Sequence, residues 1–342
     1  WAPAKVISTA QRRKSDPQCA ILPYVDSRPT HSAPQAGVVT RWRHPWRTIA
    51  GAFAVGLLTV VTGCSSASSP PASQPYPGVT ADPALRASLP SAVIADGRIA
   101  IVTDPTYPPL EFLQDGQMVG ADIDLGRAIA AKFGLEPNFQ VTPFSNVVPS
   151  VAIKEFELGI SALWADNPEA SLANMVTYFQ AGTQVAIRKS EQGRDPANGY
   201  CGQSVAVEEG TEYIDDLVKQ SAECRKRGLP RIDIRPATSQ SRASKLLEDG
   251  KTNAMVGDSP TVQYTVARSN GELIALGAPV EIRPYGIAVS PLYPELTKAT
   301  QQAVQQLIDS GVYAEILAKW QIQQGAIKAS TVLYGANPAR TS

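Results

Sequence analysis

Strand-like and helix-like segments alternate along the chain from about residue 98 to residue 321, and this alternation restricts the possible folds. Residues 98–102 and 158–161 are short apolar runs typical of buried strands, whereas residues 123–133 carry apolar side chains at helical spacing. Further strands are expected at 184–187, 204–207, 231–234, 254–256, 273–276 and 286–289, and further helices at 211–227, 239–248, 259 onward, 294–309 and 312–321. The pattern predicts an α/β fold with largely parallel sheets.

A signal segment is expected near the N-terminus. Residues 41–64 read RWRHPWRTIAGAFAVGLLTVVTGC, with a basic start, an uncharged apolar run over 49–61 and small residues before Cys64. The run is shorter than the roughly 20 residues that span a bilayer, and its flanks are typical of a secretory signal. The end resembles a bacterial lipobox, which implies that Cys64 is diacylated and becomes the new N-terminus. An ordinary signal with a chance cysteine, or an uncleaved anchor, is the alternative.

The first forty residues differ from this segment. They begin with Trp1 and are rich in Pro, Ser, Ala and Arg without periodicity. We interpret 1–40 as translation upstream of the true start or as a disordered n-region. Residues 65–83 are rich in Ser, Pro and Ala, which cannot form a core. We therefore expect a leader at 1–63, a lipidated cysteine and flexible tether at 64–95, and a folded domain beginning near residue 96.

Charge and histidine content depend on this division. The whole chain is neutral, with 31 basic and 31 acidic residues, so it has no overall basic footprint for nucleic acid. Residues 1–63 contain eight of the basic and two of the acidic residues, which leaves an acidic remainder with a net charge of −6. Both histidines, His31 and His44, lie in the leader. Histidine-dependent catalysis and the usual histidine-containing zinc sites are therefore excluded for the exported part, and we expect no cofactor and no metal.

Two cysteines, Cys201 and Cys224, remain after Cys19 is lost with the leader and Cys64 is lipidated. In an exported protein such a pair is expected to form a disulfide. A loop of this size would stabilise the fold by roughly 3 kcal/mol in the chain-entropy view. Two free thiols or a redox pair are less consistent with the sequence, because the spacing is not CxxC.

Five motifs in order along the chain resemble those of one family. They are TDPTYPPLEF at 103–112, GADIDL at 120–125, DSP at 258–260, PYGIAV at 284–289, and GVY at 311–313 followed by KW at 319–320. Together they resemble the family-3 extracellular solute-binding proteins of ABC importers, the polar amino-acid type, over about residues 96–322. The resemblance implies a type II periplasmic-binding-protein fold, with two lobes joined by a two-strand hinge and a ligand held in the cleft between them.

The resemblance also implies lobe boundaries and site residues. Lobe 1 is expected at 96–187 plus 286–326, lobe 2 at 188–285, with crossings near 186–188 and 285–288 and a C-terminal tail at 327–342. Motif matching implies that Asp258 binds a ligand ammonium group. The other implied ligand-binding residues are Asp104, Tyr107, Phe144, Ser161, Gly210 and Thr211. Capping or core roles are the alternative for each, and the cysteine pair is expected to staple lobe 2 locally.

One stretch departs from the family pattern. The family usually has S-S-x-T-x-T-x-x-R after the first-lobe strand, where Thr and Arg bind the ligand's α-carboxylate. Here an ungapped match of residues 161–169 places Trp164 on the Thr and Glu169 on the Arg. In a first interpretation, the ligand lacks a free α-carboxylate and is cationic. The acids Asp104, Glu169 and Asp258 then pair with it, and the rings of Tyr107, Phe144 and Trp164 add cation–π attraction. In a second, Arg242 or the Thr211 N–H holds the carboxylate. In a third, Glu169 is a solvated acid at a helix start.

We therefore predict a lipid-anchored extracytoplasmic binding protein that captures a small polar or cationic ligand and delivers it to an ABC permease and ATPase. We expect a monomer without catalytic residues or nucleic-acid partner. Cyclohexadienyl dehydratases share this fold and use a cleft carboxylate, so an enzyme with Glu169 as its acid is an alternative. A ligand-sensing protein for a separate membrane receptor is another.

Overall fold

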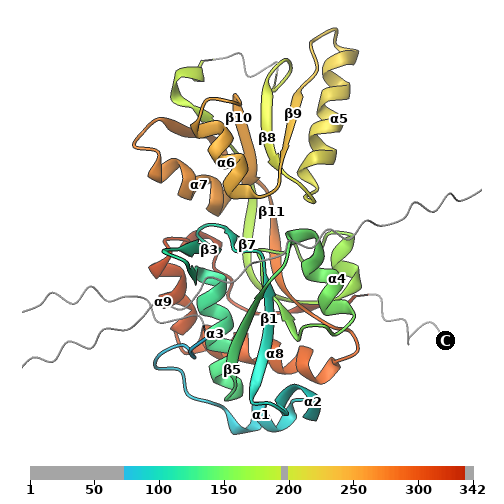
Figure 1. Cartoon of the computed structure of the whole chain (residues 1–342), viewed down its shortest axis with the longest axis vertical. Coiled ribbons are helices and arrows are strands. Elements are labelled where there is room, and N and C mark those ends of the chain that lie inside the picture. The colour runs from blue at the N-terminus through green and yellow to red at the C-terminus, as the bar shows by residue number, and fades with distance from the viewer. Residues whose placement is uncertain (1–72, 194–198, 336–342) are drawn as a thin grey trace, which may run out of the picture. The chain divides into compact units, whose positions relative to one another are not determined.

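The computed structural model describes residues 73–193 and 199–335 (Figure 1). The predicted signal segment, Cys64, the first part of the predicted tether and the last seven residues lie outside the described residues. Within the described part of the chain, the strands form one nine-stranded sheet and a separate three-stranded sheet. The order β5-β1-β6-β11-β7-β10-β8-β9 shows that the large sheet runs through two groups of elements, which we call lobe 1 and lobe 2.

Lobe 1 is centred on β1 (Arg98–Thr103), which pairs in parallel with β5 (Glu136–Val141) and β6 (Leu158–Gly159). A small antiparallel sheet follows β1 in the chain and consists of β2 (Thr106–Tyr107), β3 (Glu111–Gln114) and β4 (Gln117–Val119). The helices of this lobe are α3 (Ala121–Phe133), α4 (Val147–Ala152), α8 (Pro294–Asp309) and α9 (Val312–Lys319). The predicted helices at 123–133 and 294–309 are thus confirmed.

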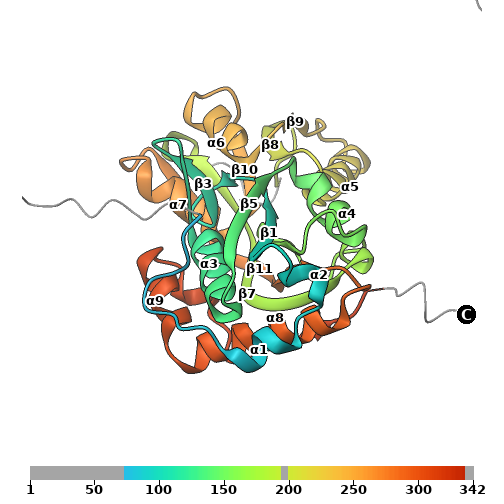
Figure 2. The same ribbon diagram turned by 60° about the horizontal axis from the view of Figure 1, so that its bottom comes forward.

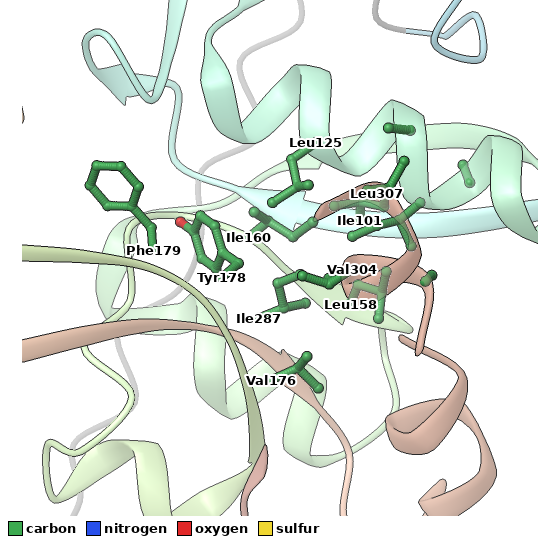
Figure 3. Packing of buried hydrophobic residues seen from close by; sticks show 14 of the residues in the cluster. Ile101, Leu125, Leu158, Ile160, Val176, Tyr178, Phe179, Ile287, Val304 and Leu307 are labelled. Carbon is green, nitrogen blue, oxygen red and sulfur yellow. The ribbon is translucent and has the colours of Figure 1, made fainter. Parts of the chain in front are cut away.

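The core of lobe 1 lies between the strands and helices α3 and α8. Figure 3 shows Ile101 and Leu158 from the sheet beside Leu125 of α3 and Val304 and Leu307 of α8. All five side chains are buried. Burial of this kind stabilises by about 1.5–3 kcal/mol for each large aliphatic side chain. The periodicity read from residues 123–133 therefore reports the face that α3 turns toward this core.

Lobe 2 contains the parallel strands β8 (Ser204–Glu208), β9 (Asp233–Ala237) and β10 (Ala254–Asp258). Its helices are α5 (Tyr213–Lys226), α6 (Gln240–Glu248) and α7 (Ser259–Arg268). The Ser239 side chain accepts a hydrogen bond from the Arg242 N–H, which confirms the predicted cap of α6. Helix α7 begins directly after β10 with Pro260 in its first turn, as predicted.

Two long strands join the lobes, namely β7 (Asn174–Arg188) and β11 (Leu273–Val289), which pair antiparallel along their length (Figure 1). Sequence analysis predicted two short strands, at 273–276 and 286–289, where β11 is continuous. Glycine and proline between them are residues that usually end a strand. Register shifts in the β7–β11 ladder accommodate those residues. Residues 183–187 of β7 pair with β10 of lobe 2, so the first crossing lies earlier than the predicted 186–188.

The prediction that the tether extends to residue 95 is wrong for its last part. Helices α1 (Pro83–Ser88) and α2 (Ser91–Ile94) bury Leu85, Leu89 and Val93 in the lobe 1 core. Figure 2 shows α1 running beside α8. The composition of the residues before these helices suggested a tether. The three apolar side chains that follow hold the segment against lobe 1.

The predicted C-terminal tail likewise begins within the folded part. Strand β12 (Val332–Leu333) pairs antiparallel with β7, and the Ser330 hydroxyl donates a hydrogen bond to the Thr177 carbonyl at 2.7 Å. This strand of two residues is too short to show strand periodicity. Its order comes from an available edge on β7 rather than from its own sequence.

The predicted disulfide is present in lobe 2. Cys201 and Cys224 are bonded, with their Cα atoms 5.6 Å apart. Cys201 precedes β8 and Cys224 lies near the end of α5, so the bond ties this helix to the sheet it covers. No helix within residues 73–193 and 199–335 has the length and apolar content needed to cross a membrane.

Candidate ligand-binding site

A pocket lies where side chains of both lobes meet. Lobe 1 contributes the strand β2 and the loops around residues 144 and 161–167, and lobe 2 contributes the end of β8, the start of α5 and the end of β10. The lining residues are Tyr107, Phe144, Ser161, Ala162, Trp164, Asn167, Glu208, Gly210, Thr211, Glu212, Tyr213 and Asp258. These loops follow the carboxyl ends of strands, the usual place for ligands in α/β sheets.

Asp258 is a buried acid at the wall of this pocket. It ends β10 and occupies the position before the first residue of α7, and only 3% of the residue is exposed. The Tyr213 hydroxyl donates to its Oδ1 and the Tyr285 hydroxyl to its Oδ2, while its N–H donates to the Tyr107 hydroxyl at 3.2 Å. Burial raises the pKa of Asp258 to about 6, although the tyrosine hydrogen bonds lower it. Both carboxylate oxygens are thus held in fixed directions at the pocket wall.

Two further carboxyl groups from lobe 2 line the pocket. Glu208 is the last residue of β8 and is 3% exposed. Burial, with the neighbouring charges of Asp104 and Asp258, raises its pKa to about 8. Glu212 is the N-cap of α5, which places its negative charge at the positive end of the helix dipole.

Aromatic rings form much of the remaining wall. Tyr107 and Tyr213 are buried, Trp164 is 7% exposed, and Phe144 is partly exposed. Trp164 packs on Tyr285 with ring centroids 4.8 Å apart. Its position is fixed by an isolated bridge between these two residues. Rings of this kind attract a cation over their faces and displace water from it.

The charge balance of the pocket points to a cationic ligand. Glu208, Glu212 and Asp258 are among its lining residues, and no Lys, Arg or His is. Glu208 and Asp258 are buried, and the cost in free energy of burying their charges raises their pKa values. A ligand cation that enters the pocket relieves this cost through charge-assisted hydrogen bonds.

A hydrogen-bonded chain in lobe 1 supports the pocket loops. The Phe144 N–H donates to Asp104 Oδ2 at 2.9 Å, and the Asp104 N–H donates to the Ser161 hydroxyl at 3.0 Å. The Ser161 hydroxyl in turn donates to Glu111 Oε1 at 2.9 Å. Glu111 is 1% exposed, and burial followed by the charge of Asp122 raises its pKa well above the usual value. This chain fixes Phe144 and Ser161 relative to each other.

Asp122 continues this support from the first turn of α3. Its Oδ2 accepts hydrogen bonds from the Ala162 N–H at 2.9 Å and from the Tyr178 hydroxyl at 2.7 Å. Burial raises its pKa to about 6. Gly120 makes this placement possible, because a Cβ there would lie 1.9 Å from the Leu110 carbonyl oxygen. The motifs at 103–112 and 120–125 therefore build the rear of the site.

The structure brings seven of the nine predicted ligand-binding residues into the pocket lining: Tyr107, Phe144, Ser161, Trp164, Gly210, Thr211 and Asp258. Asp104 and Glu169 are not among the lining residues. Asp104 lies behind Phe144 as described above. Glu169 begins the short 3-10 helix Glu169–Leu172, where burial raises its pKa. Arg242 is exposed on α6 and does not line the pocket.

Several site residues were missed by sequence reasoning. Glu208 and Glu212 lie on either side of the predicted pair Gly210 and Thr211, so their position next to a strand end was an available signal. Tyr285 lies in the PYGIAV motif, but nothing in the sequence indicates that its hydroxyl reaches Asp258. Residue contacts across the hinge have no local sequence signature.

The fold and the site define a two-lobed solute-binding protein, and comparison with known proteins agrees. The family model of bacterial extracellular solute-binding proteins, family 3, matches residues 99–323. Arginine-binding protein ArgT of Corynebacterium glutamicum is 33% identical over 253 residues, which cover 73% of this chain and 83% of that protein. The chain belongs to the bacterial extracellular solute-binding proteins, family 3.

Solved structures show the same architecture. An ancestral arginine-binding protein bound to arginine has a TM-score of 0.59 at 25% identity, covering 66% of this chain and 98% of that one. The ancestral amino acid-binding protein AncCDT-1, described as a precursor of cyclohexadienyl dehydratase, has a TM-score of 0.57 at 25% identity, covering 67% and 98%. The fold is therefore the two-lobe type II periplasmic-binding fold.

Proposed function

We propose that this protein captures a cationic amino acid, of which arginine is the type, and delivers it to an ABC importer. The observation that carries the proposal is a pocket lined by Glu208, Glu212 and Asp258 with no basic lining residue. The similarity to an arginine-binding protein supports the same ligand class independently.

The pocket offers separate features for the two ends of such a ligand. The carboxylates of Glu208 and Asp258 suit a guanidinium or ammonium group, because ionised hydrogen bonds are the strong ones. The faces of Trp164 and Phe144 suit the planar guanidinium and the aliphatic chain. The family's arginine for the α-carboxylate is absent from its matched position, so we propose that backbone N–H groups at residues 210–211 receive that carboxylate. A loop before a helix start provides such donors.

We further propose that the protein is exported and anchored through a diacylated Cys64. Two acyl chains give stable attachment where one chain gives only marginal binding. A tether between Cys64 and α1 would let the folded domain reach a permease on the same membrane. Mass spectrometry of the N-terminal peptide from purified membranes tests this part alone. A diacylglyceryl mass on Cys64 is expected, and an N-terminus elsewhere would refute it.

The ligand is tested by thermal unfolding with lysine, ornithine, arginine, glutamine and glutamate, after any co-purified ligand has been identified by mass spectrometry. We expect arginine, lysine or ornithine to raise the unfolding temperature, and glutamate to leave it unchanged. A shift with glutamate or glutamine but none with the three cations would refute the proposal.

A dehydratase activity is not supported by the site. The acid considered for it, Glu169, does not line the pocket. Prephenate carries two carboxylates, and no Lys, Arg or His is among the lining residues to pair with them. We propose that the protein is not an enzyme, and turnover of prephenate by the purified protein would overturn this.

A further inference from the structure

Arg283 lies in an irregular part of the crossing strand β11. It lies between two register shifts of the β7–β11 ladder. The loop of lobe 1 that carries Trp164 is fixed beside it, because the Ala165 N–H donates to the Pro284 carbonyl and the Gly286 N–H to the Leu163 carbonyl, both at 2.9 Å. The backbone thus holds the Arg283 side chain next to the pocket wall.

The guanidinium of Arg283 contacts both lobes. Its Nε donates to Asp166 Oδ1 at 2.8 Å, and its Nη2 lies 2.7 Å from the same oxygen. Its Nη1 donates to Glu212 Oε1. Its central carbon lies 5.0 Å from the centre of the Trp164 ring. Asp166 belongs to lobe 1 and Glu212 to the start of α5 in lobe 2, so one side chain links the two lobes.

This arrangement differs from an ordinary surface ion pair. The side chains of Arg283, Asp166 and Glu212 are 24%, 38% and 30% exposed, so water screens them only in part. Exposed pairs contribute little, but a planar guanidinium that binds two carboxylates and stacks on an indole is more strongly held. Both Trp164 and Glu212 line the pocket, so the link acts directly on residues that face the ligand.

We propose that Arg283 is an interlobe latch that positions Glu212 and Trp164 at the pocket and favours the closed arrangement of the lobes. Closure and ligand binding are then linked, because any contact made only in the closed state raises the population that binds ligand tightly. Neutral contacts also cross between the lobes. They include the hydrogen bonds from the Asp258 N–H to the Tyr107 hydroxyl, from the Ser241 hydroxyl to the Thr106 carbonyl and from the Gln324 amide to the Gln263 amide. Arg283 differs from them in being charged, so the latch weakens with salt.

The latch rests on the proposed function only in the choice of arginine and agmatine as test ligands. The variant Arg283→Met keeps the length of the side chain and removes its charge. Its matched control is Arg235→Met, because Arg235 pairs with Asp233 inside lobe 2 alone, with Nη2 to Oδ2 at 2.6 Å. Single-molecule energy transfer between dyes on the exposed residues Gln140 of lobe 1 and Gln220 of lobe 2 reports interlobe distance without ligand.

We expect Arg283→Met to shift the ligand-free distribution toward longer distances and Arg235→Met to leave it unchanged. We also expect Arg283→Met to weaken the binding of arginine and of agmatine by a similar factor of about 5–20, mostly through faster dissociation. Agmatine lacks the α-carboxylate. High salt should shift the wild type in the same direction.

Two results would overturn the latch. One is an unchanged distance distribution in Arg283→Met. The other is a loss of affinity for arginine with none for agmatine, which would make Arg283 the partner of the ligand carboxylate. A wild type that binds neither compound would refute the proposed ligand class, while the ligand-free distances would still decide on the latch.

Discussion

Asp258 and Asp122 are two buried aspartates with almost the same local chemistry. Each stands at the start of a helix, accepts a hydrogen bond from a tyrosine hydroxyl, and has its pKa raised by burial to about 6. Asp258 faces the pocket with Glu208 and Glu212 nearby, whereas Asp122 faces the Ala162 N–H and Glu111 behind the pocket. A perturbed carboxyl group therefore does not by itself mark a binding residue. The cavity in front of it does.

The largest expected effect separates these two aspartates. Asp258→Asn should weaken arginine binding by about 100-fold or more, since a buried ligand cation would lose its charged partner. The matched control Asp122→Asn should change affinity by less than about 5-fold, because an amide keeps the acceptor for Ala162 and can donate to Glu111. Isothermal titration calorimetry measures both. Equal losses in the two variants would mean that Asp258 only supports the fold.

Glu208 gives the next effect. Removing its charge by Glu208→Gln should weaken arginine binding by about 10-fold, the usual scale for one charge-assisted hydrogen bond. The same change at the exposed Glu209, which is not a lining residue, is the control. If the Glu208 variant bound arginine as tightly as the Glu209 variant does, the ligand cation would not reach β8.

The pH dependence of arginine binding should come from Asp258 and Glu208 in the pocket, and not from Asp122 and Glu111 behind it. The raised pKa values of Asp258 and Glu208 mean that the folded protein holds these protons more tightly than the unfolded chain does. Their contribution to stability is therefore complete at low pH and is lost as pH rises through about 6 and about 8. Arginine stays charged throughout, so its affinity should rise by about 10-fold or more between pH 5 and pH 8 as protons leave these carboxyls.

Calorimetry in buffers of different ionisation enthalpy checks this expectation. Arginine binding at pH 6–7 should release protons, and Glu208→Gln should reduce the number released. Burial also raises the pKa of Asp122 to about 6, but Asp122→Asn should not alter the number of protons released on binding. Proton uptake on binding would contradict the account.

Glu169 gives the smallest expected effect. Glu169→Gln should change arginine affinity by less than about 2-fold, since the half-buried side chain does not line the pocket and its charge acts weakly at a distance. A 10-fold loss in titration calorimetry would restore the interpretation in which Glu169 contacts a cationic ligand directly.

Features set by local patterns could be predicted from the sequence, whereas contacts between distant segments could not. Helical periodicity at 123–133, the Ser239 cap and the cysteine pair predict their structures because each depends on local patterns or simple pairing. The tight turn at Gly120 and the buried Glu111 are also contained in motifs. The acids at 208 and 212 and the Tyr285–Asp258 contact depend on which strand ends meet across the hinge. That information is not local, and neither is the docking of α1 or β12.

Arg283 illustrates the limit most clearly. The residues that follow it in the sequence belong to a recognisable motif. Its partners, Asp166 and Glu212, lie more than 70 residues away in the sequence. The match to the family pattern implies an arginine where this chain has Glu169. It does not show that another arginine stands beside Trp164, because that position follows from the pairing of residues 163–166 with β11.

The comparison of arginine with citrulline tests the central claim most directly. Citrulline has nearly the same shape but carries a neutral ureido group in place of the guanidinium. If the pocket selects a cation through Asp258, Glu208 and Glu212, titration calorimetry at pH 8 should show arginine binding about 100-fold or more tightly than citrulline. Equal affinities, or tighter binding of citrulline, would contradict the account.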